Sequence, residues 1–191
     1  MEKIENTIAV FERIRKYSYK IFIENGVEID LRFSREHFHH LVGFQHLTDL
    51  ESVYNPHSRQ KFYGDFRKGK VSAELIKKSS QYEVIRERVE AFEVLEDILT
   101  PGDGKIIVEF DNSKTDSIIK AKFHLYRRMG DPFKGEAVFF TLFIDSENGN
   151  TYFPVTYIVE KSNLYVREQT MYTCRIERQM LNSKKTPAAV R

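Results

Sequence analysis

The chain has 191 residues, 41% hydrophobic and 30% charged, with a formal net charge of +2. This length favours one domain, and the composition is globular, which excludes a disordered chain. A charge so close to neutral does not by itself indicate nucleic-acid binding, so a cationic site would have to come from local clustering. Cys174 is the only cysteine, which excludes an internal disulfide and a zinc site built on several cysteines.

The sequence contains no recognisable signal peptide and no candidate membrane span. The segment MEKIENTIAVFERIRK has no long apolar run after its positive charges, so it does not read as a signal peptide. No stretch approaches the ~20 apolar residues of a membrane span. We therefore expect a cytoplasmic protein with no membrane partner, with one domain over residues 1–180 and a flexible tail over 181–191.

The first hundred residues predict helices and one hairpin. Apolar residues at three- and four-residue steps predict a helix over 2–17, and Asn25-Gly26 between two alternating runs predicts a hairpin over 19–33. Ser34 is placed to cap a short helix over 35–42, with His37 at its N3 position and Gly43 ending it in a left-handed conformation. Further helices are predicted over 58–68, 72–79 and 82–99.

From residue 105 onward the hydrophobic period changes to two, which is typical of strands. Strands are predicted over 105–111, 117–129, 136–145, 151–161 and 164–176. The order of elements predicts an α+β fold, in which a helical N-terminal half with one β-hairpin packs on a C-terminal antiparallel β-meander.

The predicted strand 117–129, SIIKAKFHLYRRM, has one face without any acid. Alternation places on that face Lys120, Lys122, His124, Tyr126 and Arg128. Tyr157 and Arg167 belong to the next predicted strands and would extend the face. Lys and Arg could hold phosphates there while rings stack on bases, although a solvated antiparallel face that happens to be basic explains the pattern equally well.

Residues 35–47, REHFHHLVGFQHL, hold His37, His39, His40 and His46. The spacing matches no recognised zinc motif, and the one acid on this helix is Glu36, so we predict no metal and no other cofactor. A single imidazole is enough for general acid or base catalysis, and His40 or His46 could supply it. For any one of these histidines, local capping or packing is the competing interpretation.

Several segments in order resemble a known family. They are HFHHLVGF with its F-x-H-L-x-G core (Phe38, His40, Leu41, Gly43), KFYGDFRKGKVSAELIKKS and, within the last strands, YFPVTY. Together these resemble the phage-associated barnase–EndoU–colicin–RelE-like (BECR) nuclease superfamily, in the branch with the HLxG motif. The resemblance covers most of residues 17–175, and looser matches fall on Phe62, Tyr63, Lys70 and Lys78. His37 and His39 are not part of the family pattern.

The resemblance implies a single BECR-like domain that cleaves RNA without a metal ion, as a toxin or effector of a phage, prophage or other mobile element. Cleavage of that kind needs a base, an acid and cations that stabilise the phosphorane. For catalysis we name His40, His124 and Tyr126. For binding RNA phosphates and bases we name Lys70, Lys120, Lys122, Arg128, Tyr157 and Arg167.

Two other functions stay open at this point. The scaffold could be a non-catalytic phage or mobile-element protein that binds and inhibits a host factor, and a nuclease of this kind could have its own protein inhibitor. A nucleotide-binding protein is a third interpretation, but GDGK at 102–105 is too short for a P-loop.

Overall fold

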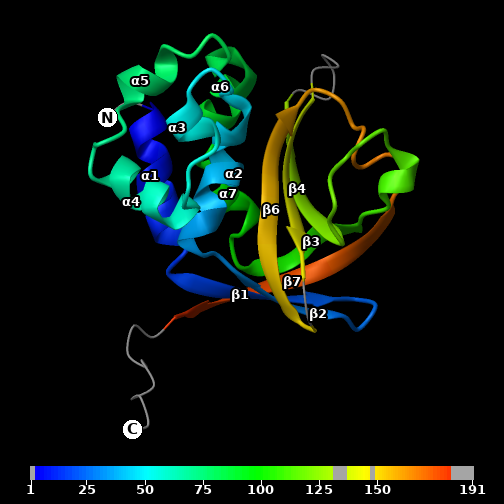
Figure 1. The fold of residues 1–191 in the computed structure, drawn as a ribbon. Helices are drawn as coiled ribbons and strands as arrows, with labels where there is room; N and C mark the ends of the chain where they lie inside the picture. The colour runs from blue at the N-terminus through cyan, green and yellow to red at the C-terminus, as the bar shows by residue number, and fades with distance from the viewer. Residues whose placement is uncertain (1–2, 131–136, 147–148, 182–191) are drawn as a thin grey trace, which may run out of the picture.

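In the computed structural model, which describes residues 3–130, 137–146 and 149–181, a group of helices lies beside a β-barrel (Figure 1). The helical elements before residue 100 are α1 (Lys3–Ile14), η1 (Arg35–His37), α2 (Phe38–Val42), η2 (Phe44–His46), α3 (Glu51–Tyr54), α4 (Arg59–Arg67), α5 (Ala73–Lys77), α6 (Tyr82–Glu90) and α7 (Val94–Ile98). The strands are β1 (Tyr17–Ile23), β2 (Glu28–Arg32), β3 (Gly102–Glu109), β4 (Phe123–Met129), β5 (Val138–Asp145), β6 (Thr151–Glu160) and β7 (Thr170–Met180).

The strands close into a barrel in the order β1-β2-β6-β5-β4-β3-β7. The prediction of an α+β fold with a helical first half and a hairpin over 19–33 agrees with this architecture, but the antiparallel meander is wrong. The hairpin itself joins the sheet, because β1 pairs with β7 and β2 pairs with β6 in parallel. Strand pairings between such distant segments are not encoded in the local alternation of side chains, which is why the pattern missed the closure.

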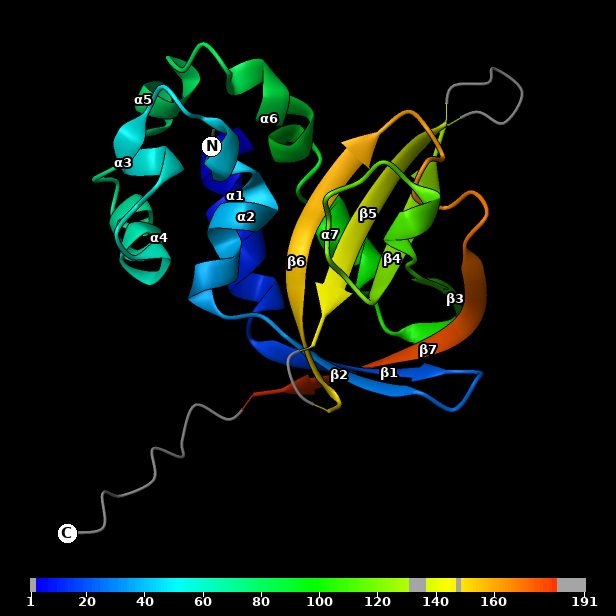
Figure 2. The same ribbon diagram turned by 45° about the vertical axis from the view of Figure 1, so that its right-hand side comes forward.

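Strand β6 faces η1, α2 and α6, whereas α7 packs on β4 and β5 (Figure 2). The segment from η1 to η2 is held against β6 by a cluster of rings around Phe38, which is fully buried. Phe38 contacts Phe11 from α1, Tyr63 from α4 and Phe92 from the α6–α7 connection, at ring-centroid distances of 5.2, 5.3 and 6.4 Å. Aromatic packing from three separate helical segments therefore fixes the histidine-rich stretch in one place.

The helix predicted over 82–99 is broken into α6 and α7. Phe92, in the break, is buried against the ring of Tyr157 at 6.1 Å. The Tyr157 hydroxyl donates to the carbonyl oxygen of Ala91 at 2.9 Å. The same carbonyl also accepts the N–H of Val94 at 3.0 Å, so a residue from β6 adds a second hydrogen bond at the interruption.

The strand predicted over 117–129 begins only at Phe123. Phe110 N–H donates to the carbonyl of Lys122, and Lys122 N–H donates to the carbonyl of Ile144, so the residues between 110 and 122 leave the sheet as an excursion that includes η3 (Asn112–Lys114). Ile118, at 95% exposure, stands out from this excursion. The alternation of lysine and apolar residues in 117–122 therefore does not reflect a strand.

The last predicted strand, 164–176, lies instead at Thr170–Met180. The residues before it, 163–169, cross back over one face of the barrel, where the Tyr165 ring packs on Phe143 and Phe110 at 5.1 and 6.2 Å. This segment covers a face of β4 that the sequence suggested was open. The predicted tail 181–191 lies, except for Leu181, outside the described residues.

Candidate nucleic-acid groove

A groove of about 1030 Å³ lies between the helices and the barrel. One wall comes from the stretch η1–η2, with Arg59 at the start of α4 and Arg88 on α6. Residues 151–156 and Ile158 of β6 contribute the floor, and residues 118–120 of the excursion form the opposite side. The groove therefore brings together segments that are far apart in the sequence, including three of the histidines.

Two histidines of the stretch, His37 and His39, stabilise local structure. His37 Nδ1 accepts the N–H of Ser34 at 3.0 Å, so the predicted cap is present with His37 reaching back to it, and its ring stacks on Phe153 in the groove floor at 5.9 Å. His39 points away from the groove and is 1% exposed, with Nε2 2.6 Å from the carbonyl oxygen of Val53. Burial lowers the pKa of both imidazoles, so both are neutral at pH 7.

His40 and His46 are the groove histidines without such a structural role. His40 is half-buried, and burial together with the charge of Arg59 and the neighbouring His39 lowers its pKa to about 4. His46 Nε2 lies 3.3 Å from Nε2 of Gln45, and burial and the charge of Arg88 lower its pKa. Both rings are therefore neutral near pH 7 and can accept a proton.

The charges around the groove are mostly positive and unpaired. Within the part of the chain that the structure describes, Arg59, Arg88 and Lys120 make no ion pair, and Glu36 is the one carboxylate of the lining. Arg32 is the exception, because its guanidinium is 2.6 Å from Asp30. Cations without anionic partners, arranged along a groove, attract phosphates.

Much of the remaining lining is apolar or aromatic. Tyr152, Phe153 and Pro154 lie in the floor, and Ile118 and Ile119 lie across from the histidines. Flat apolar surfaces of this kind accept the faces of unpaired bases. The groove therefore combines cations for phosphates, rings for bases and neutral imidazoles for proton transfer.

Of the residues named from the sequence, the structure brings His40 and Lys120 to this groove. His124 is not on an open face: it is fully buried, its Nε2 is 2.8 Å from the carbonyl oxygen of Tyr165, and burial lowers its pKa to about 4. The prediction of a continuous exposed row through Lys122, His124 and Tyr126 is therefore wrong. Its physical cause is the 163–169 segment, which covers that side of β4.

The other named residues are also engaged elsewhere. Tyr157 is fully buried with its hydroxyl on Ala91, and Lys122 Nζ donates to the hydroxyl oxygen of Ser146 at 2.8 Å. Lys70 Nζ is 3.5 Å from an Asp65 carboxylate oxygen, and Arg167 pairs with Glu168. Tyr126 packs on Phe139, and Arg128 is exposed beside it at the end of β4.

Sequence reasoning did not select Arg59, Arg88 or Gln45 for the site. Arg88 lies in the charged run YEVIRERVE, where nothing distinguishes it from Arg86, which is exposed and pairs with Glu83 at 3.2 Å. The glycine of the HLxG motif, Gly43, is the one local feature related to the position of Arg88, because a side chain at 43 would collide with Arg88.

A metal centre has no support among the described residues, where no group of three or more His, Cys, Asp or Glu side chains comes together. The absence of a metal from the reaction stays a prediction. In the same part of the chain, no helix combines the length and the apolar character that crossing a membrane requires.

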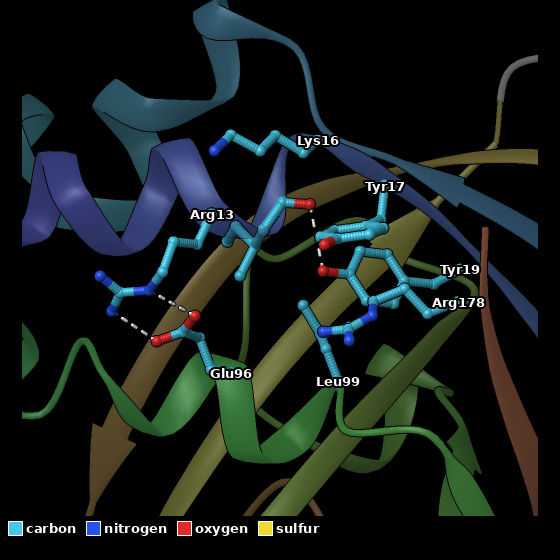
Figure 3. Close-up of a pocket in the computed structure, with 8 residues that line it drawn as sticks. Arg13, Lys16, Tyr17, Tyr19, Glu96, Leu99 and Arg178 are labelled. Carbon is cyan, nitrogen blue, oxygen red and sulfur yellow. Dashed lines mark hydrogen bonds and ion pairs between the residues drawn. The ribbon is translucent and has the colours of Figure 1, made fainter. Parts of the chain in front are cut away.

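A smaller pocket of about 280 Å³ lies where the end of α1 meets β1, β7 and α7 (Figure 3). Its charged groups are largely satisfied. Arg13 binds both carboxylate oxygens of Glu96, at 2.8 and 2.6 Å, and the Tyr19 hydroxyl donates to the carbonyl of Ile14 at 3.0 Å. Arg178 lies over the ring of Tyr17 at 4.4 Å. These contacts stabilise the junction, and they leave fewer unpaired charged groups to bind a ligand than the groove offers.

Comparison with known proteins gives one match. A family model described as phage-Barnase-EndoU-ColicinE5/D-RelE like nuclease4 matches residues 3–180. This match confirms the resemblance at the level of the family, and it does not address the HLxG branch. No curated protein and no solved structure matches the chain.

Proposed function

We propose, from the premise that the chain belongs to this phage-associated nuclease family, that the groove between the helices and the barrel binds RNA and cleaves it without a metal ion. The observation that carries the proposal is that neutral His40 lines the same groove as three unpaired cations, which come from segments far apart in the sequence. A toxin or effector role for the phage or mobile element follows as part of the same proposal.

RNA suits such a groove because it carries its own nucleophile. The 2′-oxygen attacks the adjacent phosphorus, the bond to the 5′-oxygen breaks, and the departing oxygen takes up a proton, which leaves a 2′,3′-cyclic phosphate. The protein has to accept the 2′-proton, neutralise the phosphorane and protonate the leaving oxygen. We assign the first role to His40, and His46 is the candidate for the proton donor.

A pKa of about 4 makes His40 a weak base in the free protein. A phosphodiester anion beside the ring would oppose the effects of burial and of Arg59, and would raise the pKa toward neutrality. The proposal therefore couples substrate binding to activation of the base. The pH dependence of kcat should consequently show a base with a higher pKa than that of kcat/KM.

The decisive measurement is cleavage of an oligoribonucleotide in EDTA between pH 5 and 8. We expect products ending in a 2′,3′-cyclic phosphate, and no cleavage of the same oligomer with 2′-O-methyl groups. His40→Gln should lower kcat by at least about a hundredfold with little change in KM, because the imidazole acts in the transition state. His57→Gln is the matched control, since His57 is exposed and outside the groove lining.

Absence of cleavage by the wild type under all these conditions would overturn the nuclease proposal. If the same preparation binds a host protein tightly and His40→Gln does not affect that binding, the non-catalytic inhibitor function replaces it.

A further inference from the structure

The side chain of Arg88 occupies an unusual position. It leaves α6 toward the groove and contributes to its lining, whereas Arg86 on the same helix is exposed and pairs with Glu83. Arg88 is half-buried overall, but its Nη1 atom is fully buried and has no hydrogen-bond partner. Burial lowers its pKa to about 10, so the guanidinium is still a cation at neutral pH.

No described side chain compensates this charge. The ionisable groups that interact with it are His46, which is neutral, the Tyr157 hydroxyl, which already donates to Ala91, and Tyr165, none of them a carboxylate. The other unpaired cations of the lining, Arg59 and Lys120, add to the positive potential instead of reducing it. An unpaired guanidinium nitrogen in a buried position is destabilising, so its presence calls for a partner that the polypeptide does not supply.

The glycine of the HLxG motif makes room for this guanidinium. Gly43 has φ +94°, and a β-carbon built on it would lie 2.8 Å from Arg88 Nη1, 3.3 Å from Arg88 Cδ and 3.0 Å from Ile85 Cγ2. The first distance is shorter than real contacts of a β-carbon, so any side chain at 43 would displace the guanidinium. Gly43 therefore ends α2 in a left-handed conformation and also lets Arg88 lie against the backbone.

We propose that the Arg88 guanidinium, seated against Gly43, is the group that binds the phosphate of the substrate in the groove. A guanidinium presents several donors in one plane and can bind two oxygens of a phosphate at once, which lysine cannot do. The phosphate supplies the missing anion to the part of the guanidinium that lines the groove. The identity of the substrate as a phosphodiester rests on the proposed function, but binding of a phosphate group alone does not require catalysis.

Inorganic phosphate is the probe, titrated into the full chain by calorimetry at constant ionic strength maintained with chloride. We expect saturable one-to-one binding to the wild type and to Arg86→Gln, the matched control on the same helix. Arg88→Gln should weaken that binding by about tenfold or more, because it removes a charge-assisted pair of hydrogen bonds. Arg88→Lys keeps the charge without the planar fork and should lie between the two.

A second readout separates ligand binding from a structural role. Without phosphate, Arg88→Gln should be at least as stable as the wild type to urea, because it removes a buried unpaired charge. With phosphate, the wild type should gain stability and Arg88→Gln should not. A structural arginine would give the opposite order in the absence of phosphate.

The inference is wrong if phosphate does not bind the wild type, if Arg88→Gln binds it as tightly, or if Arg88→Gln and Arg88→Lys both lower stability in its absence. Phosphate binding that depends on Arg88, in a protein that does not cleave RNA, would contradict the nuclease proposal and support this one. Cleavage that persists unchanged in Arg88→Gln would support the nuclease and exclude Arg88 as the phosphate-binding residue.

Discussion

At the scale of single residues, the contacts of each histidine decide what it can do. His39 and His124 each place Nε2 on a backbone carbonyl oxygen, of Val53 and of Tyr165 respectively, and both are buried. His37 caps η1, which leaves His40 and His46 as the groove imidazoles free of a structural contact with the backbone. The sequence left His40 and His46 open for this role and the family resemblance pointed to His40. Only the packing separates these two from His37 and His39.

His124 makes stability depend on pH. Its folded pKa of about 4 lies below the ordinary value of 6.5, so the ring is neutral in both states above pH 6.5. Between pH 6.5 and 4 the unfolded chain binds a proton that the folded chain does not, and the free energy of unfolding falls as the pH falls. For a fully buried ring the loss by pH 4 is on the order of 3 kcal/mol.

Urea unfolding of wild type and His124→Phe between pH 7.5 and 4.5 measures this effect. The variant loses the hydrogen bond to Tyr165 and should be less stable at pH 7.5, but its stability should fall less steeply toward acid. His57→Gln, at an exposed position, should keep the wild-type slope. Parallel curves for wild type and His124→Phe would contradict the assignment of the acid-sensitive proton site to His124.

At the scale of elements, the ends of helices follow the sequence closely. Ser72 accepts the N–H of Leu75 as the predicted cap of α5, and Gly43 has the left-handed conformation expected at the end of α2, so both predictions are confirmed. Turns and caps depend on neighbouring residues and can be predicted locally. The break between α6 and α7 was missed because its stabilising contact, the Tyr157 hydroxyl on Ala91, comes from β6.

The end of α2 allows a matched test with glycines. Gly43→Ala should lower the free energy of unfolding by about 1–2 kcal/mol, because alanine is strained at positive φ and its β-carbon would contact Arg88 and Ile85. Gly64→Ala, within α4, meets no atom within 4 Å and should leave stability unchanged or raise it by up to about 1 kcal/mol. Equal stability of Gly43→Ala and wild type in thermal or urea unfolding would refute the backbone argument.

The alternating pattern of 117–129 predicted the side of the strand correctly but not its extent or its exposure. It placed His124 and Tyr126 on the same side of β4, where their rings are in fact neighbours at 6.2 Å. It could not show that residues before Phe123 leave the sheet, or that 163–169 cover the face. Alternation gives the side of a strand, whereas exposure depends on whatever else packs on that side.

At the scale of the whole molecule, the strands of the barrel pair over very different lengths, and the pairing of β2 with β6 is a short seam. β5 and β6 pair over residues from Phe139 to Asp145, whereas β2 and β6 pair only through Asp30 with Thr151 and Leu31 with Tyr152. This seam closes the barrel, and Tyr152 is also part of the groove floor. The α+β content follows from the sequence, whereas the predicted meander does not hold. Closure of the barrel depends on this non-local parallel contact, and the groove exists only once the barrel and the helices are in place.

The short seam should open more readily than the ladder between β5 and β6. The Asp30 amide donates across it to the carbonyl of Asn150 at 2.7 Å, whereas the amides of Phe140 and Leu142 lie in the longer antiparallel ladder. Because few hydrogen bonds hold the seam, it can separate without unfolding the ladder. Native-state hydrogen exchange should therefore show a lower opening free energy for the Asp30 amide than for the amides of Phe140 and Leu142. Because Tyr152 lies in both seam and groove, an oligonucleotide bound in the groove should slow exchange at Asp30. Equal opening free energies at Asp30, Phe140 and Leu142 would mean that the barrel opens only as one unit, and that the groove is as rigid as its core.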